Sequence, residues 1–534
     1  MNTNRECRVY DQLGRLTKAI FPHGETINKS YLEGKIGQDF IESKTFTLTP
    51  DGMPAVAELP KRSNGDFKNK AMMVKLSSGK LIGWGDNSTG VLCNGIQSNT
   101  SSLPQEPLFD PSTTVPPFSA TIVDWVFTNA NLYVVYSNGW VYSGGANDYG
   151  QLGHGDLMAR PFLKRIESFI SGNLKIIKVW ADGGYATLNG GGCVYFQADD
   201  YSMYGCGLNT AGNLGNSINP TTNQQIAQPC VGIAHTSTQF VVDVQIAVVG
   251  TSVSTYMIFN TRALFVAGYN SQYQLGVGNS TANVSGGFIT ALQESPVGPP
   301  SSGPASTDAI SVSPGTTACS PFATTQQNTA FNLFVTGALV GTITSTIFSV
   351  DSLTTVSHPH PMKIESGGGQ HGFAYALYLD NGLLHTWGYN SQNNLFQNTT
   401  TNPAPFAVAS NRPVGTVAKV LMSKGQQGLT TTAQMALIMA SGQVVYAGAD
   451  VGQQGIPDSS GAYSALPMPN FLLDGSDSIV DACVHGTGLT QRWFILTANG
   501  KLYACGDNSY GLCSGGRLTP VTMAQNLWRR IAFS

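Results

Sequence analysis

The sequence predicts an all-β fold, a β-propeller with seven clear blades and a degenerate eighth, preceded by an N-terminal arm. The first observation is a short phrase that occurs seven times: a glycine, any residue, an asparagine or aspartate, and usually a leucine five residues later. Successive phrase glycines are 60, 62, 61, 120, 60 and 58 residues apart. Such regular spacing indicates one repeated supersecondary unit, and the gap of 120 residues corresponds to two periods. The glycines and their asparagine or aspartate partners are Gly85, Asn87, Gly145, Asn147, Gly207, Asn209, Gly268, Asn270, Gly388, Asn390, Gly448, Asp450, Gly506 and Asn508.

The second observation is the strand pattern inside each unit. In the unit of Gly145, the run WVYSGG ends at the phrase, and an upstream run, NLYVVYSNG, ends at Gly139. Both runs are rich in β-branched and aromatic residues, and the SNG end is typical of a hairpin turn. A third run, TIVDWVF, lies further upstream at residues 121–127. Three or four short antiparallel strands in each unit of about 60 residues describe a propeller blade.

The phrase itself is expected to shape the chain where a strand ends. Glycine permits a sharp exit from the strand, because it adopts positive φ without a Cβ penalty. The asparagine can hydrogen-bond the backbone of its own turn. We expect the leucine to anchor the loop between neighbouring blades.

The double gap between Gly268 and Gly388 contains either a degenerate eighth blade or an insertion, at about residues 280–360. The runs DAISVSPG (308–315) and AFNLFVTGALVG (330–341) resemble the third run and the hairpin of a blade, without the phrase. We therefore favour eight blades, and treating the segment as an insertion leaves seven.

The ends of the chain suggest how the ring closes. The first unit has its hairpin at residues 71–85 but no third run of the usual kind before it, and the chain ends in a strand-like run, NLWRRIAFS. We expect this C-terminal strand to complete the first blade and close the propeller. The domain prediction is an arm or anchor segment at residues 1–65, followed by the propeller at residues 66–534.

Composition limits the partners that the chain can attract. The net charge is −3, and 11% of the residues are charged, so no strong field favours nucleic acid. No run approaches the roughly 18 apolar residues of a membrane span, and we predict no membrane insertion. A neutral surface rich in Ser, Thr, Asn and Gln suits a virion or an extracellular surface better than the cytoplasm. The N-terminus has no apolar segment typical of a signal peptide.

Catalytic, cofactor-binding and metal-binding motifs are not evident, and we predict no enzyme activity, no catalytic residues, no cofactor and no metal. His358, His360 and His371 lie close together in sequence, but no carboxylate or thiolate has convincing ligand spacing. The carboxylates Asp199 and Asp200 are interpreted as part of a solvated loop. The glycine triplets at 190–192 and 367–369 are interpreted as tight turns, since neither opens a helix.

Aromatic residues in or beside the phrase loops form a candidate binding rim. Gathered on one face of the propeller, such side chains can bind a protein or a sugar, and the alternative is that they pack between blades. The candidate rim residues are Tyr149, Tyr269, Tyr273, Tyr389 and Tyr510.

The strand ending in a small or aromatic residue plus glycine, followed by xNxxGQLG, resembles the repeat of the regulator-of-chromosome-condensation family. GGANDYGQLGHGD (144–156) is the best match, and WGDNSTGVL, WGYNSQNNL and CGDNSYGL are good ones. The resemblance covers residues from about 70 to 534 and implies a propeller whose broad face binds a macromolecule. Family members include a nucleotide-exchange factor, ubiquitin-ligase modules and inhibitory propellers. This chain lacks the Lys/Arg-rich N-terminal tail of the chromatin-binding member.

These observations favour a non-enzymatic structural or binding protein. The arm and the propeller face are expected to bind protein partners, and a glycan or another receptor is a further candidate ligand. A virion or surface assembly anchored by the arm is the favoured setting. The alternatives are an intracellular regulator of a GTPase or ubiquitin pathway, and a polysaccharide hydrolase, which would need clustered carboxylates.

Overall fold

The computed structural model describes most of the ring and separate strands elsewhere. In the arm and between residues 308 and 379, only the backbone of the strands is described. The described residues are 7–10, 16–20, 25–28, 43–45, 49, 52–60, 70–182, 192–216, 222–233, 235–249, 252–261, 263–270, 275, 283–290, 308–312, 322–327, 330–335, 338–339, 342–343, 361–369, 372–379, 384–388, 390, 394–397, 404–422, 434–448, 464–465, 477–485, 492–515, 525–531 and 533.

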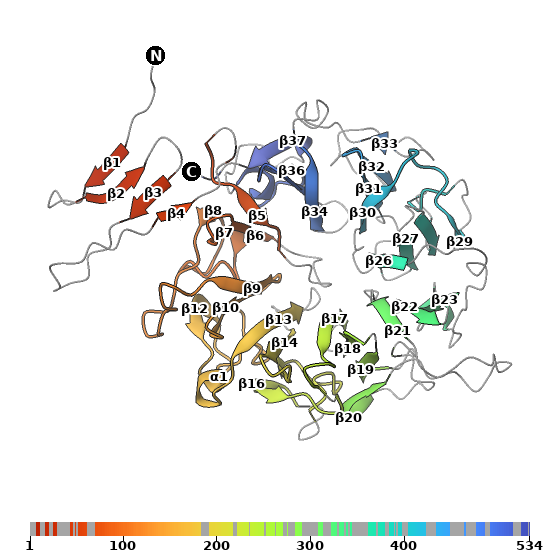
Figure 1. Cartoon of the computed structure of the whole chain (residues 1–534), viewed down its shortest axis with the longest axis horizontal. Helices are drawn as coiled ribbons and strands as arrows, with labels where there is room; N and C mark the ends of the chain where they lie inside the picture. The colour runs from red at the N-terminus through yellow and green to blue at the C-terminus, as the bar shows by residue number, and fades with distance from the viewer. Residues whose placement is uncertain are drawn as a thin grey trace, which may run out of the picture.

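The chain forms a β-propeller whose described strands make eight antiparallel sheets arranged around a centre (Figure 1). The first strand of each sheet lies nearest the centre and the last strand lies at the periphery. The fold class predicted from the phrase is therefore confirmed. None of the described helices is long and apolar enough to cross a membrane.

The first four blades follow one another in chain order, each with four strands. Blade 1 contains β5 (Val56–Glu58), β6 (Ala71–Leu76), β7 (Leu81–Asn87) and β8 (Ser98–Gln105). Blade 2 contains β9 (Ile122–Phe127), β10 (Asn131–Tyr136), β11 (Val141–Gly145) and β12 (Arg160–Arg165), followed by the short helix α1 (Glu167–Ser171). Blade 3 contains β13 (Ile176–Asp182), β14 (Cys193–Ala198), β15 (Met203–Gly207) and β16 (Gln224–Pro229). Blade 4 contains β17 (Val241–Val249), β18 (Ser252–Phe259), β19 (Leu264–Tyr269) and β20 (Asn283–Thr290).

The last three blades also have four strands each. Blade 6 contains β26 (Pro361–Gly369), β27 (Gly372–Leu379), β28 (Leu384–Gly388) and β29 (Ala404–Val408). Blade 7 contains β30 (Val417–Met422), β31 (Gln434–Met439), β32 (Val444–Gly448) and β33 (Ser464–Ala465). Blade 8 contains β34 (Ile479–His485), β35 (Arg492–Thr497), β36 (Leu502–Gly506) and β37 (Gln525–Ile531), with the 3-10 turn η3 (Leu512–Ser514) between β36 and β37.

Blade 5 fills the double gap between phrase glycines, which confirms the preference for eight blades over seven. It contains the three strands β21 (Asp308–Val312), β22 (Phe322–Gln327) and β23 (Ala330–Val335). Strand β21 contacts β18 of blade 4 and β26 of blade 6, so the sheet takes a blade's place in the ring. The expected hairpin within residues 330–341 was wrong, because β23 pairs with the upstream strand β22. A separate two-stranded sheet follows, made of β24 (Ala338–Leu339) and β25 (Thr342–Ile343).

The ring does not close in the way expected from the sequence. The C-terminal strand β37 pairs with β36 and completes blade 8, not blade 1. Blade 1 has its own inner strand, β5, which pairs with β6. Contacts between the two blades close the ring instead: the Val56 amide donates to the Gly500 carbonyl at 2.9 Å, Trp84 and Phe533 pack with ring centroids 5.5 Å apart, and Trp84 Nε1 donates to the Leu512 carbonyl at 3.0 Å.

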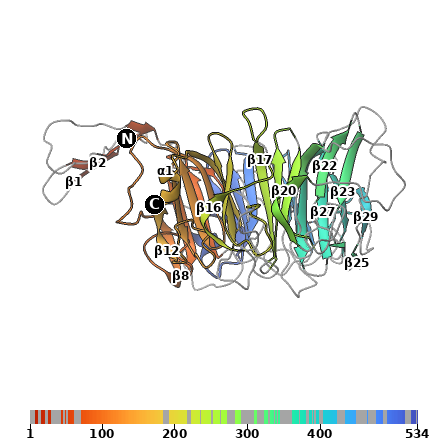
Figure 2. The same ribbon diagram turned by 90° about the horizontal axis from the view of Figure 1, so that it is seen from below.

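The N-terminal arm is shorter than predicted, because β5 lies within the segment assigned to it. The arm carries its own antiparallel sheet of β1 (Cys7–Tyr10), β2 (Leu16–Ile20), β3 (Glu25–Asn28) and β4 (Ser43–Thr45). This sheet lies outside the ring, beside blade 1, and projects beyond it in the side view (Figure 2). The boundary between arm and propeller therefore lies upstream of residue 56 and not at residue 65.

Apolar clusters between neighbouring sheets hold the ring together. One cluster combines Val126 and Tyr133 of blade 2 with Val194 and Phe196 of blade 3. Blades 8 and 1 share another cluster, in which Phe494 lies with Met72. Burying apolar faces between adjacent sheets supplies the stability that one small sheet lacks.

Strand direction gives the ring two distinct faces. The turns between the second and third strands, such as residues 137–140 between β10 and β11, lie on one face, here called the turn face. The third strand then runs across the ring and ends at the phrase, so the phrase loops lie on the opposite face, here called the loop face. Each inner strand begins at the turn face, since Ile122 pairs with Tyr136.

Candidate functional site: the two faces of the ring

The phrase glycines on the loop face hold backbone conformations that other residues cannot adopt without strain. Gly145 has φ of 108°, and the φ values of five other phrase glycines lie between 101° and 117°: Gly85, Gly207, Gly268, Gly448 and Gly506. A Cβ atom on Gly145 would lie 2.0 Å from the carbonyl oxygen of Ala130. Glycine is required here because the neighbouring strand approaches the backbone too closely for any side chain.

The phrase asparagines tie each loop into a closed turn. Asn147 Oδ1 accepts from the Leu152 amide at 2.9 Å, and its Nδ2 donates to the Asp156 carbonyl at 2.8 Å. Five more blades repeat the first contact five residues on, through Leu92, Leu214, Leu275, Leu395 and Cys513, at 2.8–3.2 Å. The expected turn-bonding role of asparagine is confirmed. In blade 8, Cys513 takes the leucine's place and is fully buried.

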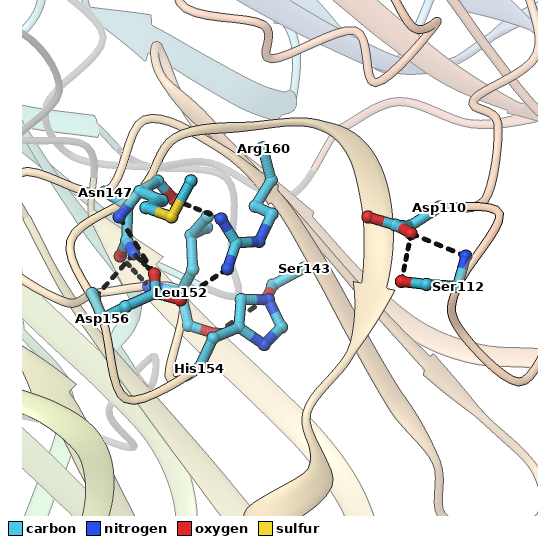
Figure 3. A network of polar contacts seen from close by, with 9 residues as sticks. Asp110, Ser112, Ser143, Asn147, Leu152, His154, Asp156 and Arg160 are labelled. Atoms are coloured by element: carbon cyan, nitrogen blue, oxygen red, sulfur yellow. Dashed lines mark hydrogen bonds and ion pairs between the residues drawn. The ribbon is translucent and has the colours of Figure 1, made fainter.

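Blade 2 has an extended polar network on the loop face (Figure 3). The Arg160 guanidinium donates to the Asp156 carboxylate at 2.6 Å and to the Met158 carbonyl at 3.2 Å. His154 lies beside this pair, with Nε2 3.1 Å from Ser143 Oγ. Burial, together with the charges of Arg160 and Lys164, lowers the pKa of His154 to about 4. The imidazole is therefore neutral near pH 7.

The Ser143–His154 contact is not a nucleophile–base pair. The Ser143 hydroxyl donates to the Leu152 carbonyl at 2.8 Å and is fully buried. With that proton committed, a hydrogen bond between the two side chains requires the tautomer in which His154 Nε2–H donates to Ser143 Oγ, and this nitrogen then has no lone pair to remove a proton. The network therefore stabilises the loop and offers no reactive hydroxyl to solvent.

The candidate rim tyrosines have packing roles where the structure describes them. Tyr149 is half-buried against the apolar cluster shared by blades 3 and 4. Tyr510 packs at the junction of blades 8 and 1, with Lys70 Nζ 4.8 Å from its ring centroid. Tyr269 is half-buried at the end of β19. Tyr273 and Tyr389 lie outside the described residues, so a binding role for the rim as a whole stays a prediction.

The other sequence candidates are reported where the structure describes them. Asp200 Oδ1 accepts from the Ser202 amide at 2.9 Å and from its hydroxyl, which is the solvated loop turn that we predicted. The glycine triplet at 367–369 lies in strand β26 and not in the tight turn that we expected. His358, His360 and His371 lie outside the described residues. No cluster of three or more metal-ligating side chains occurs in the described part of the chain.

The inner strands on the turn face share a β-bulge that the sequence analysis did not predict. In blades 1, 2, 3, 4, 7 and 8, the second residue of the inner strand is the extra residue of the bulge. It therefore has no paired residue on the neighbouring strand. Three of these bulge residues are exposed valines: Val123 is 50% exposed, Val242 is 38% exposed and Val480 is 58% exposed. We call Val123, Val242 and Val480 the valine collar; each is the second residue of an inner strand, at the end of the strand that begins on the turn face.

The residue after each of these bulges is charged, and in blades 1, 2 and 7 it joins its blade to the next one. Asp124 of blade 2 accepts from the Val179 amide of blade 3 at 2.9 Å. Glu58 of blade 1 accepts from Trp125 Nε1 of blade 2 at 2.9 Å. Lys419 of blade 7 donates to the Ala482 carbonyl of blade 8 at 2.8 Å. The sequence pattern that marks this bulge is an apolar residue, then a residue that differs between blades, then a charged residue, as in the runs IVD and VAK.

A cavity of about 480 Å³ opens between blades 1 and 2 on the turn face. Its floor consists of Leu81, Val134 and Leu163, which are almost fully buried. Phe109 and Tyr136 line its wall, and the turn of residues 77–80 forms part of its rim. Apolar floors with a few polar rim groups are typical of small-ligand sites.

Comparison with known proteins supports the repeat. Residues 138–185 match the family model described as the regulator of chromosome condensation (RCC1) repeat. This match begins at the β10–β11 turn of blade 2 and runs into blade 3, so the sequence repeat is offset from the structural blade. No curated protein sequence matches the chain. The chain is a β-propeller that carries an RCC1-type repeat at residues 138–185.

Solved propeller structures resemble this one at low sequence identity. Human WBSCR16 has a TM-score of 0.48 and 13% identity, covering 84% of this chain and 93% of its own. Prp20p from Saccharomyces cerevisiae has a TM-score of 0.48 and 12% identity, covering 90% and 88%. Yeast RCC1 (Prp20), in a structure with bound Kap60, has a TM-score of 0.47 and 12% identity, covering 95% and 91%.

Proposed function

We propose that this protein is a non-catalytic recognition protein that binds a protein partner through the turn face of its propeller. The observation that carries the proposal is the valine collar. Its side chains are exposed at equivalent positions of blades 2, 4 and 8, at the start of the inner strands β9, β17 and β34. Apolar side chains that are exposed at the same position of several blades offer a protein partner apolar contacts on one face.

The polar side chains of the phrase loops act within the ring. The phrase asparagines, together with Arg160 and His154, are engaged in hydrogen bonds within the loops. Such groups stabilise the ring and have little remaining capacity to bind a partner.

A paired set of variants tests the face. The partner would be captured from an extract of the source with the full chain, identified by mass spectrometry and purified for affinity measurement. Val123→Lys with Val480→Lys places charges in the collar and is expected to weaken binding at least tenfold. Asp148→Lys with Thr210→Lys is the matched loop-face control and is expected to leave the affinity within twofold. The opposite pattern would show that the partner binds the loop face.

We further propose that the arm attaches the propeller to a larger assembly, with a virion or cell-surface particle as the favoured setting. The arm has a sheet of its own, β1 to β4, outside the ring. The low charge of the chain supports display in such a setting. Deleting residues 1–48 is expected to release the propeller from the native particle while the purified partner still binds. Retention of the truncated chain on the particle would contradict the anchoring role.

The second candidate function is an intracellular regulator of a small GTPase or of a ubiquitin pathway. The RCC1-type repeat at residues 138–185 favours it. The discriminating measurement is the rate of labelled-nucleotide release from purified small GTPases. An exchange factor must increase this rate at catalytic amounts of propeller, whereas a display protein leaves it unchanged.

A further inference from the structure

We propose that the cavity between blades 1 and 2 binds a neutral sugar unit. This inference deepens the proposed recognition function, because it names a ligand class for one site on the turn face. The volume of about 480 Å³ lies within the usual range for small-ligand sites, which is roughly 300–1,000 Å³.

The first argument is a buried hydroxyl in the rim. Ser78 Oγ is buried and has no hydrogen-bond partner among the described residues. A buried polar atom without a partner is uncommon in native proteins, and an absent water or ligand is one explanation. Ser78 also lines the cavity, and a change of its χ1 rotamer would turn the hydroxyl toward a bound group that can supply the missing hydrogen bond.

The second argument is the combination of an aromatic wall and a hydroxyl-bearing rim. Phe109 and Tyr136 both pack edge-on against the ring of Tyr142, with centroids 5.1 and 5.5 Å away. These contacts hold the two partly exposed rings in place at the cavity. The rim adds the hydroxyls of Ser77 and Thr121. A pyranose has an apolar face of C–H groups and an edge of hydroxyls, so it matches both kinds of surface.

The third argument is the charge of the lining, which favours a neutral ligand. Lys80 Nζ lies 2.7 Å from Glu106 Oε1, and Lys75 Nζ lies 2.8 Å from Glu58 Oε1. Each ammonium group at the cavity therefore already has a carboxylate partner. An anionic ligand would have to compete with these carboxylates, whereas a neutral sugar can bond to both groups of a pair.

The test is binding of the full chain to an array of neutral, sialylated and sulfated glycans, with hits confirmed by saturation-transfer NMR. We expect binding to neutral glycans. Ser78→Ala should weaken it about tenfold, as expected for a lost buried hydrogen bond. Thr121→Trp should fill the cavity mouth and abolish binding. Ser441→Ala is the matched control, because Ser441 precedes the turn glycine of blade 7 as Ser78 does in blade 1.

Several results would overturn the proposal: no neutral glycan bound above the level of Thr121→Trp, equal binding by wild type and Ser78→Ala, or a preference for charged glycans over their neutral parents. Saturation transfer to a partner-derived peptide and not to sugars would identify a peptide site instead. Binding of the captured protein partner is measured on the same variants. Loss of glycan binding alone would leave the proposed function intact, and glycan binding without any protein partner would contradict that function.

Discussion

The phrase loops on one face of this propeller and the bulged ends of the inner strands on the other differ in how they use their side chains. On the loop face, the phrase asparagines and the ion pair of Arg160 and Asp156 are engaged in bonds within the ring. On the turn face, Val123 and Val480 are exposed, and a cavity opens between two blades. The difference indicates that the repeated, easily recognised residues maintain the fold, while the variable residues of the other face are free to recognise a partner.

The largest expected effect concerns the phrase glycine of the loop face. Gly145→Ala places a Cβ atom 2.0 Å from the Ala130 carbonyl oxygen at φ of 108°, so we expect more than about 4 kcal/mol of destabilisation. The control is Gly442→Ala in a hairpin turn, where φ is 83° and no heavy atom lies within 4 Å of the added Cβ. This control should cost about 1–2 kcal/mol. Urea unfolding and soluble yield measure both, and equal losses would contradict the comparison.

The phrase asparagine should come next in magnitude. Asn147→Ala leaves the Leu152 amide and the Asp156 carbonyl without their side-chain partner, which should lower the free energy of unfolding by about 2–4 kcal/mol. The turn-face control is Asn138→Ala, which removes one bond, to the Trp140 amide, from a partly exposed turn. We expect that variant to lose less than about 1 kcal/mol. A larger loss from Asn138→Ala than from Asn147→Ala would show that the loop network is dispensable.

The sequence predicted the features that repeat and missed those that are short. The seven copies of the phrase identified seven blades, because the backbone at the end of each third strand requires the glycine and the loop after it requires the asparagine or aspartate. Strand β5 was not predicted, because its three residues, Val56 to Glu58, are too few to show an alternation of apolar and polar side chains. Twelve residues also separate it from β6, so it does not stand beside the hairpin in the sequence. Without it, the C-terminal strand was assigned to blade 1. The cavity could not be predicted, because its wall joins Phe109 of a connecting segment to Tyr136 of another blade.

The buried imidazole of the loop face should make stability depend on pH. The folded-state pKa of His154 is lowered to about 4 by burial and by Arg160 and Lys164, whereas the unfolded chain has an ordinary value near 6.5. The unfolded chain binds the proton first, so stability is retained above about pH 6.5 and lost as pH falls toward 4. We expect about 1 kcal/mol per pH unit from this residue. The measurement is the difference between wild type and His154→Asn in urea unfolding at pH 7, 5.5 and 4.5, and parallel curves would contradict it.

The smallest effect should come from the ion pair at the turn-face cavity. Lys80 and Glu106 are 51% and 49% exposed, so their attraction is screened by water, and Lys80→Ala should change the free energy of unfolding by less than about 1 kcal/mol. Arg492 and Asp507 form a buried pair on the loop face, 2% and 9% exposed. Arg492→Met should cost about 3–5 kcal/mol, because it leaves a carboxylate buried beside an apolar side chain. Thermal and urea unfolding of the two variants measure the contrast directly. If Lys80→Ala proves as destabilising as Arg492→Met, the exposed ion pair at the cavity also stabilises the ring. The expected difference between the two pairs would then be wrong.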